Sequence, residues 1–171
     1  MEKSIIDVID TAVKIGLGAL ISGISAYVLS KTNSNQEKEK GKRERTISIL
    51  ENISFKIDSA RHKTVEATHP FWQGMLNQGG HNYSEHAGKS IDVFLQANSL
   101  IGEARALAIL IGVPLLPEEL DKIESLFEEF YKATAQGQIL QQADFFNNKL
   151  EQSELCFSKC FSLLADAYKN A

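Results

Sequence analysis

Apolar residues recur at alternating spacings of three and four from residue 50 onward. This spacing places them on one face of an α-helix. Three series are Leu50, Ile53, Ile57, Ala60, Thr64, Ala67; Val93, Ala97, Leu100, Ala104, Leu107, Ile111; and Leu116, Leu120, Ile123, Phe127, Phe130, Thr134. The fourth and longest is Ile139, Ala143, Phe146, Leu150, Ser153, Phe157, Cys160, Leu164, Ala167. No segment alternates with period two over a useful length, so the pattern predicts an all-α protein.

Proline and glycine set the expected ends of the first helix and of the loop after it. Pro70 disfavours helical backbone at the residue before it, so the first helix should end near Thr68. Residues 69–83 then break the periodicity and form the one long connection, which contains the only tryptophan, Trp72. A connection of that length in a compact bundle is expected to be functional or mobile.

Turn and capping residues separate the remaining helices. Asn82 can open a capping box, while Gly112 and Pro114 end the second helix. Pro117 is well placed in the first turn of the third helix, and Gly137 separates it from the last. Four amphipathic helices with two short connections and one longer one favour an antiparallel four-helix bundle over residues 46–171.

The N-terminal part follows a different pattern, because residues 15–29 contain no charge and lie between Lys14 and Lys31. Fifteen residues make a helix of only ~22 Å, short of a ~30 Å hydrocarbon core. If the Lys14 side chain extends toward the headgroups, residues 11–30 reach ~30 Å. The pattern therefore predicts a single transmembrane helix within residues 1–30.

Two other interpretations of this segment are a helix buried in a soluble protein and a cleaved signal peptide. A signal peptide has a positively charged start, whereas Glu2, Asp7 and Asp10 make this one mixed. Gly23 and Ser25 are nevertheless small enough for cleavage. We favour the membrane anchor over both.

Charge then sets the expected orientation. The net charge is −4, but residues 1–45 hold eight Lys/Arg against six Asp/Glu, and residues 46–171 hold ten against sixteen. Residues 31–45 carry six Lys/Arg and residues 1–14 carry two, so the positive-inside rule places the C-terminal side in the cytoplasm. We expect a single-pass protein of the cell membrane, with residues 31–45 as a charged, solvated stalk that can also touch anionic lipid.

Small residues recur at every fourth position within the predicted anchor. This spacing lets a second membrane helix approach closely, and it predicts a homo-oligomer or pairing with another membrane protein. Glycine and serine are also simply common in transmembrane helices. The candidate packing positions are Gly16, Gly18, Ala19, Ser22, Gly23 and Ala26.

Candidate chemistry is sparse. Cys156 and Cys160 lie four residues apart, a poor geometry for a disulfide within one helix, and we expect free thiols with Cys160 in the core. His69, His81 and His86 lack the spacing of a metal motif, and solvated histidines are the simpler interpretation. We expect no metal and no cofactor, although neither the histidines nor the two cysteines are excluded as ligands.

No catalytic triad, Glu-x-x-His pair or glycine-rich nucleotide loop is present, so an enzyme is not expected, apart from metal-dependent activity hidden in the bundle. The acidic bundle argues against nucleic acid as a partner.

The anchor, stalk and bundle plan, known from many unrelated small bacterial membrane proteins, predicts a tethered module that presents a cytoplasmic bundle to a protein partner. The alternative is an oligomerising, membrane-acting effector of the toxin or defence type. The candidate partner surface is Phe71, Trp72, Glu118, Glu119, Asp121, Glu124 and Glu128.

Overall fold

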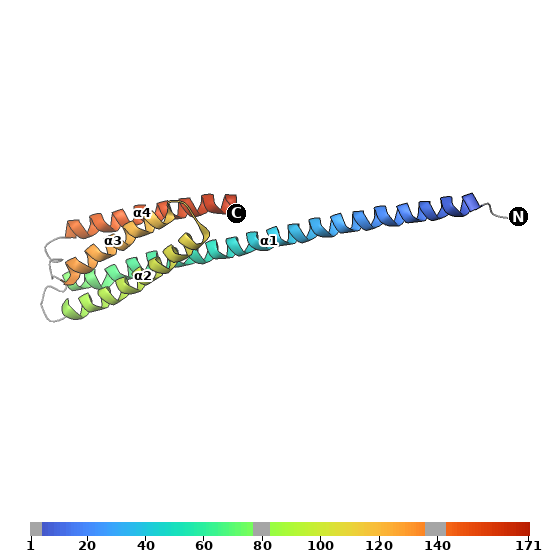
Figure 1. Cartoon of the computed structure of the whole chain (residues 1–171). Helices are drawn as coiled ribbons and strands as arrows, with labels where there is room; N and C mark the ends of the chain where they lie inside the picture. The colour runs from blue at the N-terminus through green and yellow to red at the C-terminus, as the bar shows by residue number, and fades with distance from the viewer. Residues whose placement is uncertain (1–4, 77–82, 136–142) are drawn as a thin grey trace. The chain divides into compact units, whose positions relative to one another are not determined.

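The computed structural model describes the backbone of residues 5–76, 83–135 and 143–171, and the side chains of residues 22–69, 88–133 and 146–171. Its elements are four helices, α1 (Ile5–Leu76), α2 (Tyr83–Ile111), α3 (Leu116–Ala135) and α4 (Ala143–Asn170), drawn in Figure 1. These described segments contain no strand, as the sequence predicts. The chain divides into two compact units, Met1–Arg45 and Thr46–Ala171.

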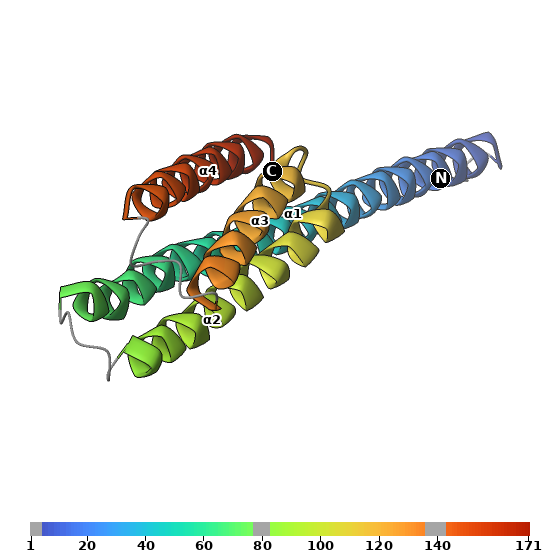
Figure 2. The ribbon, with the colours of Figure 1, turned by 90° about the vertical axis from the view of Figure 1, so that its left-hand side faces the viewer.

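The unit Thr46–Ala171 is a bundle in which every neighbouring pair of helices is antiparallel. Side-chain contacts join α1 to α2, α2 to α3, α3 to α4 and α4 back to α1, and Figure 2 shows α3 between α2 and α4. In each pair the residue number rises on one helix as it falls on the other. The contacts that establish this are Lys56–Glu103 and Ala67–Ser90, Arg105–Asp121 and Phe94–Phe130, Phe130–Phe146 and Glu129–Lys149, and Arg61–Glu154 together with Leu50 and Ala167, which line one cavity.

The core of this bundle contains a cluster of aromatic rings in which Phe130 stacks on Phe94 and meets Phe146 edge-on. Phe130 of α3 lies with its ring centroid 5.0 Å from that of Phe94 and 4.8 Å from that of Phe146. All three side chains are buried, and they come from three different helices. Burial of each ring contributes roughly 2–3 kcal/mol of hydrophobic free energy, so this cluster ties α2, α3 and α4 together at one level of the bundle.

The predicted apolar stripes of α1 and α3 are confirmed: their predicted residues are buried, except Thr134, whose side chain lies outside the described residues. In α4 the predicted stripe is confirmed from Phe146 onward, with Leu150 and Ala167 half-buried. Ile139 and Ala143 lie outside the described side chains.

The predicted stripe of α2 is shifted by one residue along much of its length. Val93, Leu100 and Leu107 are only half-buried, whereas their successors Phe94, Ile101 and Ala108 are buried. Ala97 and Ala104 belong to both stripes and are buried. The helix is apolar on more than one side, so periodicity alone does not identify the face that packs inward.

The predicted end of the first helix near Thr68 is wrong, because α1 continues through Pro70 to Leu76. Residues 69–76 of the predicted loop are therefore helical. Proline inside a helix costs ~3 kcal/mol through a lost hydrogen bond and a steric clash. The turn before Pro70 packs against the bundle: Ala67 and Thr68 are buried, and Ser90 Oγ of α2 donates to Ala67 O at 2.9 Å, which favours keeping this part of α1 helical.

The turn between α2 and α3 follows the glycine signal in the sequence. Gly112 has φ +68°, its N–H donates to Ile109 O, and Val113 N–H donates to Ala108 O. This is the paired hydrogen-bond arrangement of a Schellman cap. Val113 is buried against the core, which completes the motif.

The unit Met1–Arg45 is helical from Ile5 onward, and all of its described side chains, residues 22–45, are exposed. The charged part contains local ion pairs such as Lys42–Glu39 at 3.0 Å and Lys40–Glu44 at 3.9 Å. Pairs this exposed contribute little free energy.

Among the described side chains, one helical stretch is long and apolar enough to cross a membrane, and it is Gly88–Ile111 of α2 rather than the N-terminal segment. Residues 11–21 of the predicted anchor lie outside the described side chains, so the anchor stays a prediction. The α2 stretch carries Glu103 and Arg105, which pair with Lys56 and Asp121, and its buried stripe packs in the bundle. Its length and apolar composition are weak evidence for a membrane span.

Candidate interaction surfaces

The described end of the predicted anchor is an uncovered apolar helix surface. Ile24, Tyr27, Val28 and Leu29 are each more than half exposed. Burial of such side chains stabilises by roughly 25 cal/mol per Å² of apolar area. Because these four are exposed, the described chain does not gain that hydrophobic free energy. A partner outside the described chain, either lipid or protein, would gain that free energy.

The predicted helix-packing positions fall partly within the described residues. Ser22, Gly23 and Ala26 are exposed, and a Cβ added at Gly23 would meet nothing within 4 Å. The side chains at Gly16, Gly18 and Ala19 lie outside the described residues. The described part of the small-residue face is therefore open to a second helix.

The five predicted acidic positions of α3 do not form one face. Asp121 lies 2.6 Å from Arg105 of α2, and Glu124 lies 4.0 Å from the same guanidinium. Glu119 lies on the side toward α4, where it pairs with Lys122 at 2.5 Å and its charge contributes to raising the pKa of Cys156. These pairs neutralise much of the charge that we expected to attract a basic partner.

The two remaining acidic positions are more accessible. Glu128 is exposed and pairs with Lys132 one turn along α3 at 3.0 Å. Glu118 is exposed and forms no ion pair with the described residues. Phe71 and Trp72, expected on a loop, lie instead on the helical backbone of α1, and their side chains are outside the described residues.

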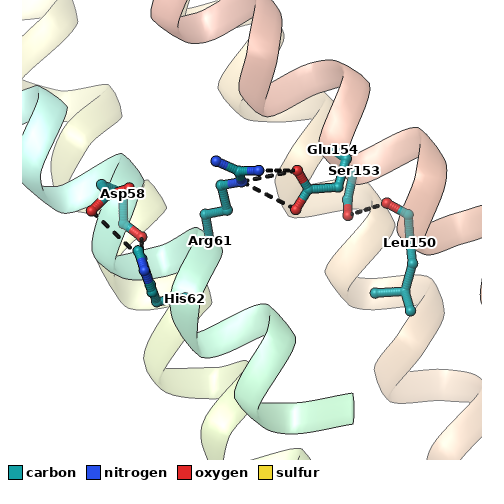
Figure 3. Close-up of polar contacts among 6 residues, drawn as sticks. All are labelled: Asp58, Arg61, His62, Leu150, Ser153 and Glu154. Atoms are coloured by element: carbon teal, nitrogen blue, oxygen red, sulfur yellow. Dashed lines mark hydrogen bonds and ion pairs between the residues drawn. The ribbon is translucent and has the colours of Figure 1, made fainter.

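A polar contact joins α1 to α4 on the surface of the bundle. Arg61 Nε donates to Glu154 Oε1 at 3.2 Å and Oε2 at 2.9 Å, and a terminal nitrogen of Arg61 lies 2.7 Å from Oε2 (Figure 3). These hydrogen bonds raise the pKa of Arg61. The ring of His62 turns back to its own helix, and its Nδ1 lies 2.9 Å from Asp58 O. Arg61 and Glu154 therefore hold the bundle closed, while His62 takes no part in the contact between helices.

The bundle has a cavity of about 470 Å³ at the end that contains the α2–α3 turn, which we call the end cavity. Its walls are mainly apolar, with a few polar groups. They are Thr46, Leu50, Ile111, Gly112, Val113, Pro114, Leu115, Leu163, Asp166, Ala167, Asn170 and Ala171. Leu115 and Leu163 also line a second cavity of about 210 Å³, which we call the side cavity, together with Glu118, Glu119, Lys159 and Ser162.

Sequence analysis did not identify these cavities. Their most unusual wall residue is Leu115, a leucine with φ +62° that is largely exposed. A signal exists, because Pro114 fixes its own φ and Pro117 restricts the backbone of Leu116, on either side of Leu115. That signal predicts an irregular turn, but it does not predict which leucine points outward.

A third cavity, of about 280 Å³, lies between α2 and α3. Leu95 and Tyr131 line it with Phe94 and Phe127, and Asn98 contributes a buried side-chain oxygen that has no hydrogen-bond partner among the described residues. A buried acceptor without a partner is costly, so a donor from outside the described chain would be stabilised here.

The two cysteines are free thiols, as expected, with Cys156 half-buried and Cys160 buried. Burial raises the pKa of Cys160 from 9.0 to about 12 and also raises the pKa of Cys156. Thiolates are the form that binds metal or attacks electrophiles, so neither group is activated. Within the described side chains no three His, Cys, Asp or Glu residues come together as a metal site.

Comparison with known proteins adds no assignment to these surfaces, since no family model, curated protein or solved structure matches the chain.

Proposed function

We propose that the chain is a membrane-tethered interaction module. In this proposal residues 11–30 span the cell membrane, residues 31–45 form a charged stalk, and the bundle 46–171 faces the cytoplasm and binds a protein partner. The observation that carries it is the exposure of Ile24, Tyr27, Val28 and Leu29, because an apolar helix end without a covering element is stabilised by lipid. Tyr27 has the amphipathic ring that suits a membrane interface.

The bundle supports the second half of the proposal, since its core from Leu50 to Leu164 is made within Thr46–Ala171. An anchor that is not needed for the core is free to act as a tether. Many exposed charges on the bundle are already paired, so a partner has to compete with these pairs or bind apolar surface.

Copurification tests this function directly. The full-length chain is extracted from membranes in a gentle detergent, and the same chain with the anchor replaced by an unrelated transmembrane helix is the control. A specific protein recovered with both versions supports the module, because the bundle then carries the binding. Recovery of this chain alone, in several detergents and after crosslinking in cells, would contradict it.

A second candidate is an oligomerising effector that disturbs the membrane through its anchor. It is favoured by the open small-residue face at Ser22, Gly23 and Ala26. Toxicity on overexpression that Gly18→Leu or Gly23→Leu abolishes would favour the effector. Toxicity that is absent, or unchanged by both substitutions, argues for the tethered module.

A further inference from the structure

The end cavity and the side cavity share two walls, Leu115 and Leu163, and both lie within the unit Thr46–Ala171. The end cavity is mainly apolar and is walled on its inner side by Leu50, Ile111 and Val113. Its volume of about 470 Å³ falls in the range of small-molecule sites. An apolar compartment therefore adjoins a charged one across a pair of leucines.

Leu115 is held in an unfavourable conformation at this boundary. Its φ of +62° lies in the left-handed region, where a side chain beyond Cβ crowds the backbone and glycine or asparagine is preferred. The turn keeps the leucine largely exposed instead of using it in the core. Strained backbone of this kind clusters at ligand-binding sites, so an exposed apolar residue held in it points to a binding role.

The side cavity offers charges of both signs. Glu118 and Lys159 are exposed on its walls, and they form no ion pair with each other or with another described residue. Glu119 is already engaged by Lys122 at 2.5 Å. Ser162 adds a hydroxyl to the walls of the side cavity. A purely anionic head group would face two glutamates, and a purely cationic one would leave Lys159 without a partner.

We infer that the two cavities bind one single-chain amphiphile with a zwitterionic head group, of the lysophospholipid class. Its alkyl chain occupies the end cavity and passes Leu115 and Leu163. Its head group lies in the side cavity, where Lys159 meets the phosphate and Glu118 meets the ammonium group. This inference does not rest on the anchor, because both cavities are built from the bundle alone.

The test is photolabelling of the full-length chain, in the presence of diacyl-lipid nanodiscs, with an alkylphosphocholine that carries a diazirine near the end of its chain. Peptide mapping should place the bundle's label on residues 46–50, 111–115 and 163–171, which line the end cavity. Octylphosphocholine below its micelle concentration should compete, and octyl glucoside or octyl sulfate should compete at least about fivefold less well. Label spread evenly over the bundle, or equal competition by all three compounds, overturns the inference.

Matched leucine variants separate binding from folding. Leu115→Asn suits the left-handed backbone and so keeps or improves stability, but it places an amide on the apolar wall and should reduce labelling about tenfold. Leu110→Asn changes a similarly exposed leucine that lines neither cavity, and labelling should not change. Lys159→Gln should weaken competition by octylphosphocholine about threefold. Equal labelling of the two leucine variants overturns the site.

Discussion

Arg61 of α1 and Glu154 of α4 form a forked ion pair that closes the fourth side of the bundle, with the Arg61 Nε 2.9 Å and a terminal nitrogen 2.7 Å from Glu154 Oε2. The two residues are 93 positions apart in the chain. A forked arginine–carboxylate contact has more geometric specificity than a single hydrogen bond. It fixes the register of α4 against α1, next to Ser153, which is buried and donates to Leu150 O.

A double-mutant cycle with Arg61→Gln and Glu154→Gln should give a coupling free energy of about 1 kcal/mol in urea unfolding. Both side chains remain nearly half exposed, so solvent screens the pair and the value stays far below that of a buried ion pair. The control is Lys132–Glu128, a more exposed pair within one helix, for which we expect about 0.3 kcal/mol. Equal coupling in the two cycles would show that Arg61 and Glu154 do not lock the helices together.

Two glycines should respond to the same substitution with opposite signs. Gly112→Ala should lower the free energy of unfolding by about 1 kcal/mol, because φ +68° strains any Cβ even though nothing lies within 4 Å of it. Gly88→Ala should raise the free energy by about 0.5–1 kcal/mol, because Gly88 is an ordinary helical position with open space around it. Urea unfolding of both variants measures the difference, and a shift of the same sign in both would contradict this account of the turn.

Periodicity predicted the stripes of α1 and α3 because these helices are amphipathic, with charged residues on the side opposite the stripe. It failed on α2, where Val93 and Phe94, or Leu107 and Ala108, are equally apolar neighbours. Only the shape of the adjoining helices decides between them, and small residues such as Ala104 and Ala108 face the core, where α1 and α3 pack against α2. Local sequence carries no information about that fit.

The end of α1 was missed for a related reason. The rule that a helix stops before proline reflects a cost of a few kcal/mol, and it does not include tertiary contacts. Here Ala67 and Thr68 are buried, and the hydroxyl of Ser90 donates to the backbone carbonyl of Ala67 in the turn before Pro70. Ser90 lies 23 residues from Ala67, so no local pattern predicts this hydrogen bond.

Cys160 should be inert toward thiol reagents in the folded bundle. With its pKa at about 12, almost no thiolate is present at pH 8, and we expect iodoacetamide to modify it at least about tenfold more slowly than Cys156. In denaturing urea the two should react at similar rates. Peptide mass spectrometry after timed labelling gives both rates, and rapid native modification of Cys160 would show that it is not buried.

The same shift predicts how alkali affects stability. The folded protein keeps Cys160 protonated, whereas the unfolded chain loses the proton near pH 9, so ionisation favours unfolding as the pH rises from about 9 to about 12. Below pH 9 this destabilising effect is absent, because the thiol is protonated in both the folded and the unfolded chain. Cys160→Ala should flatten that part of the pH profile measured by circular dichroism. A profile unchanged by the substitution would contradict the assignment to Cys160.

Removal of residues 1–45 should leave a soluble, strongly helical protein. The buried cluster lies between Leu50 and Leu164, so the deletion removes none of the core side chains that the structure describes. The deletion variant and the full-length chain should differ little in their urea midpoints when both are followed by a bundle probe such as the reactivity of Cys160. An aggregated or unfolded deletion variant would show that the N-terminal helix is part of the folding unit.

The full-length chain should behave as an integral membrane protein with a cytoplasmic C-terminus. Transfer of residues 11–30 into lipid depends on apolar burial, so high salt should not release the protein, since salt screens only charges. Alkali at pH 11 should not release it either, although the bundle itself loses stability there through Cys160. A C-terminal reporter should register as cytoplasmic, because six basic residues follow the segment and only two precede its apolar core. Addition of four lysines before Asp7 should weaken or reverse this orientation. If the full-length chain is soluble without detergent, the exposed side chains of Ile24, Val28 and Leu29 are covered by protein instead of lipid, and the tether fails as an explanation.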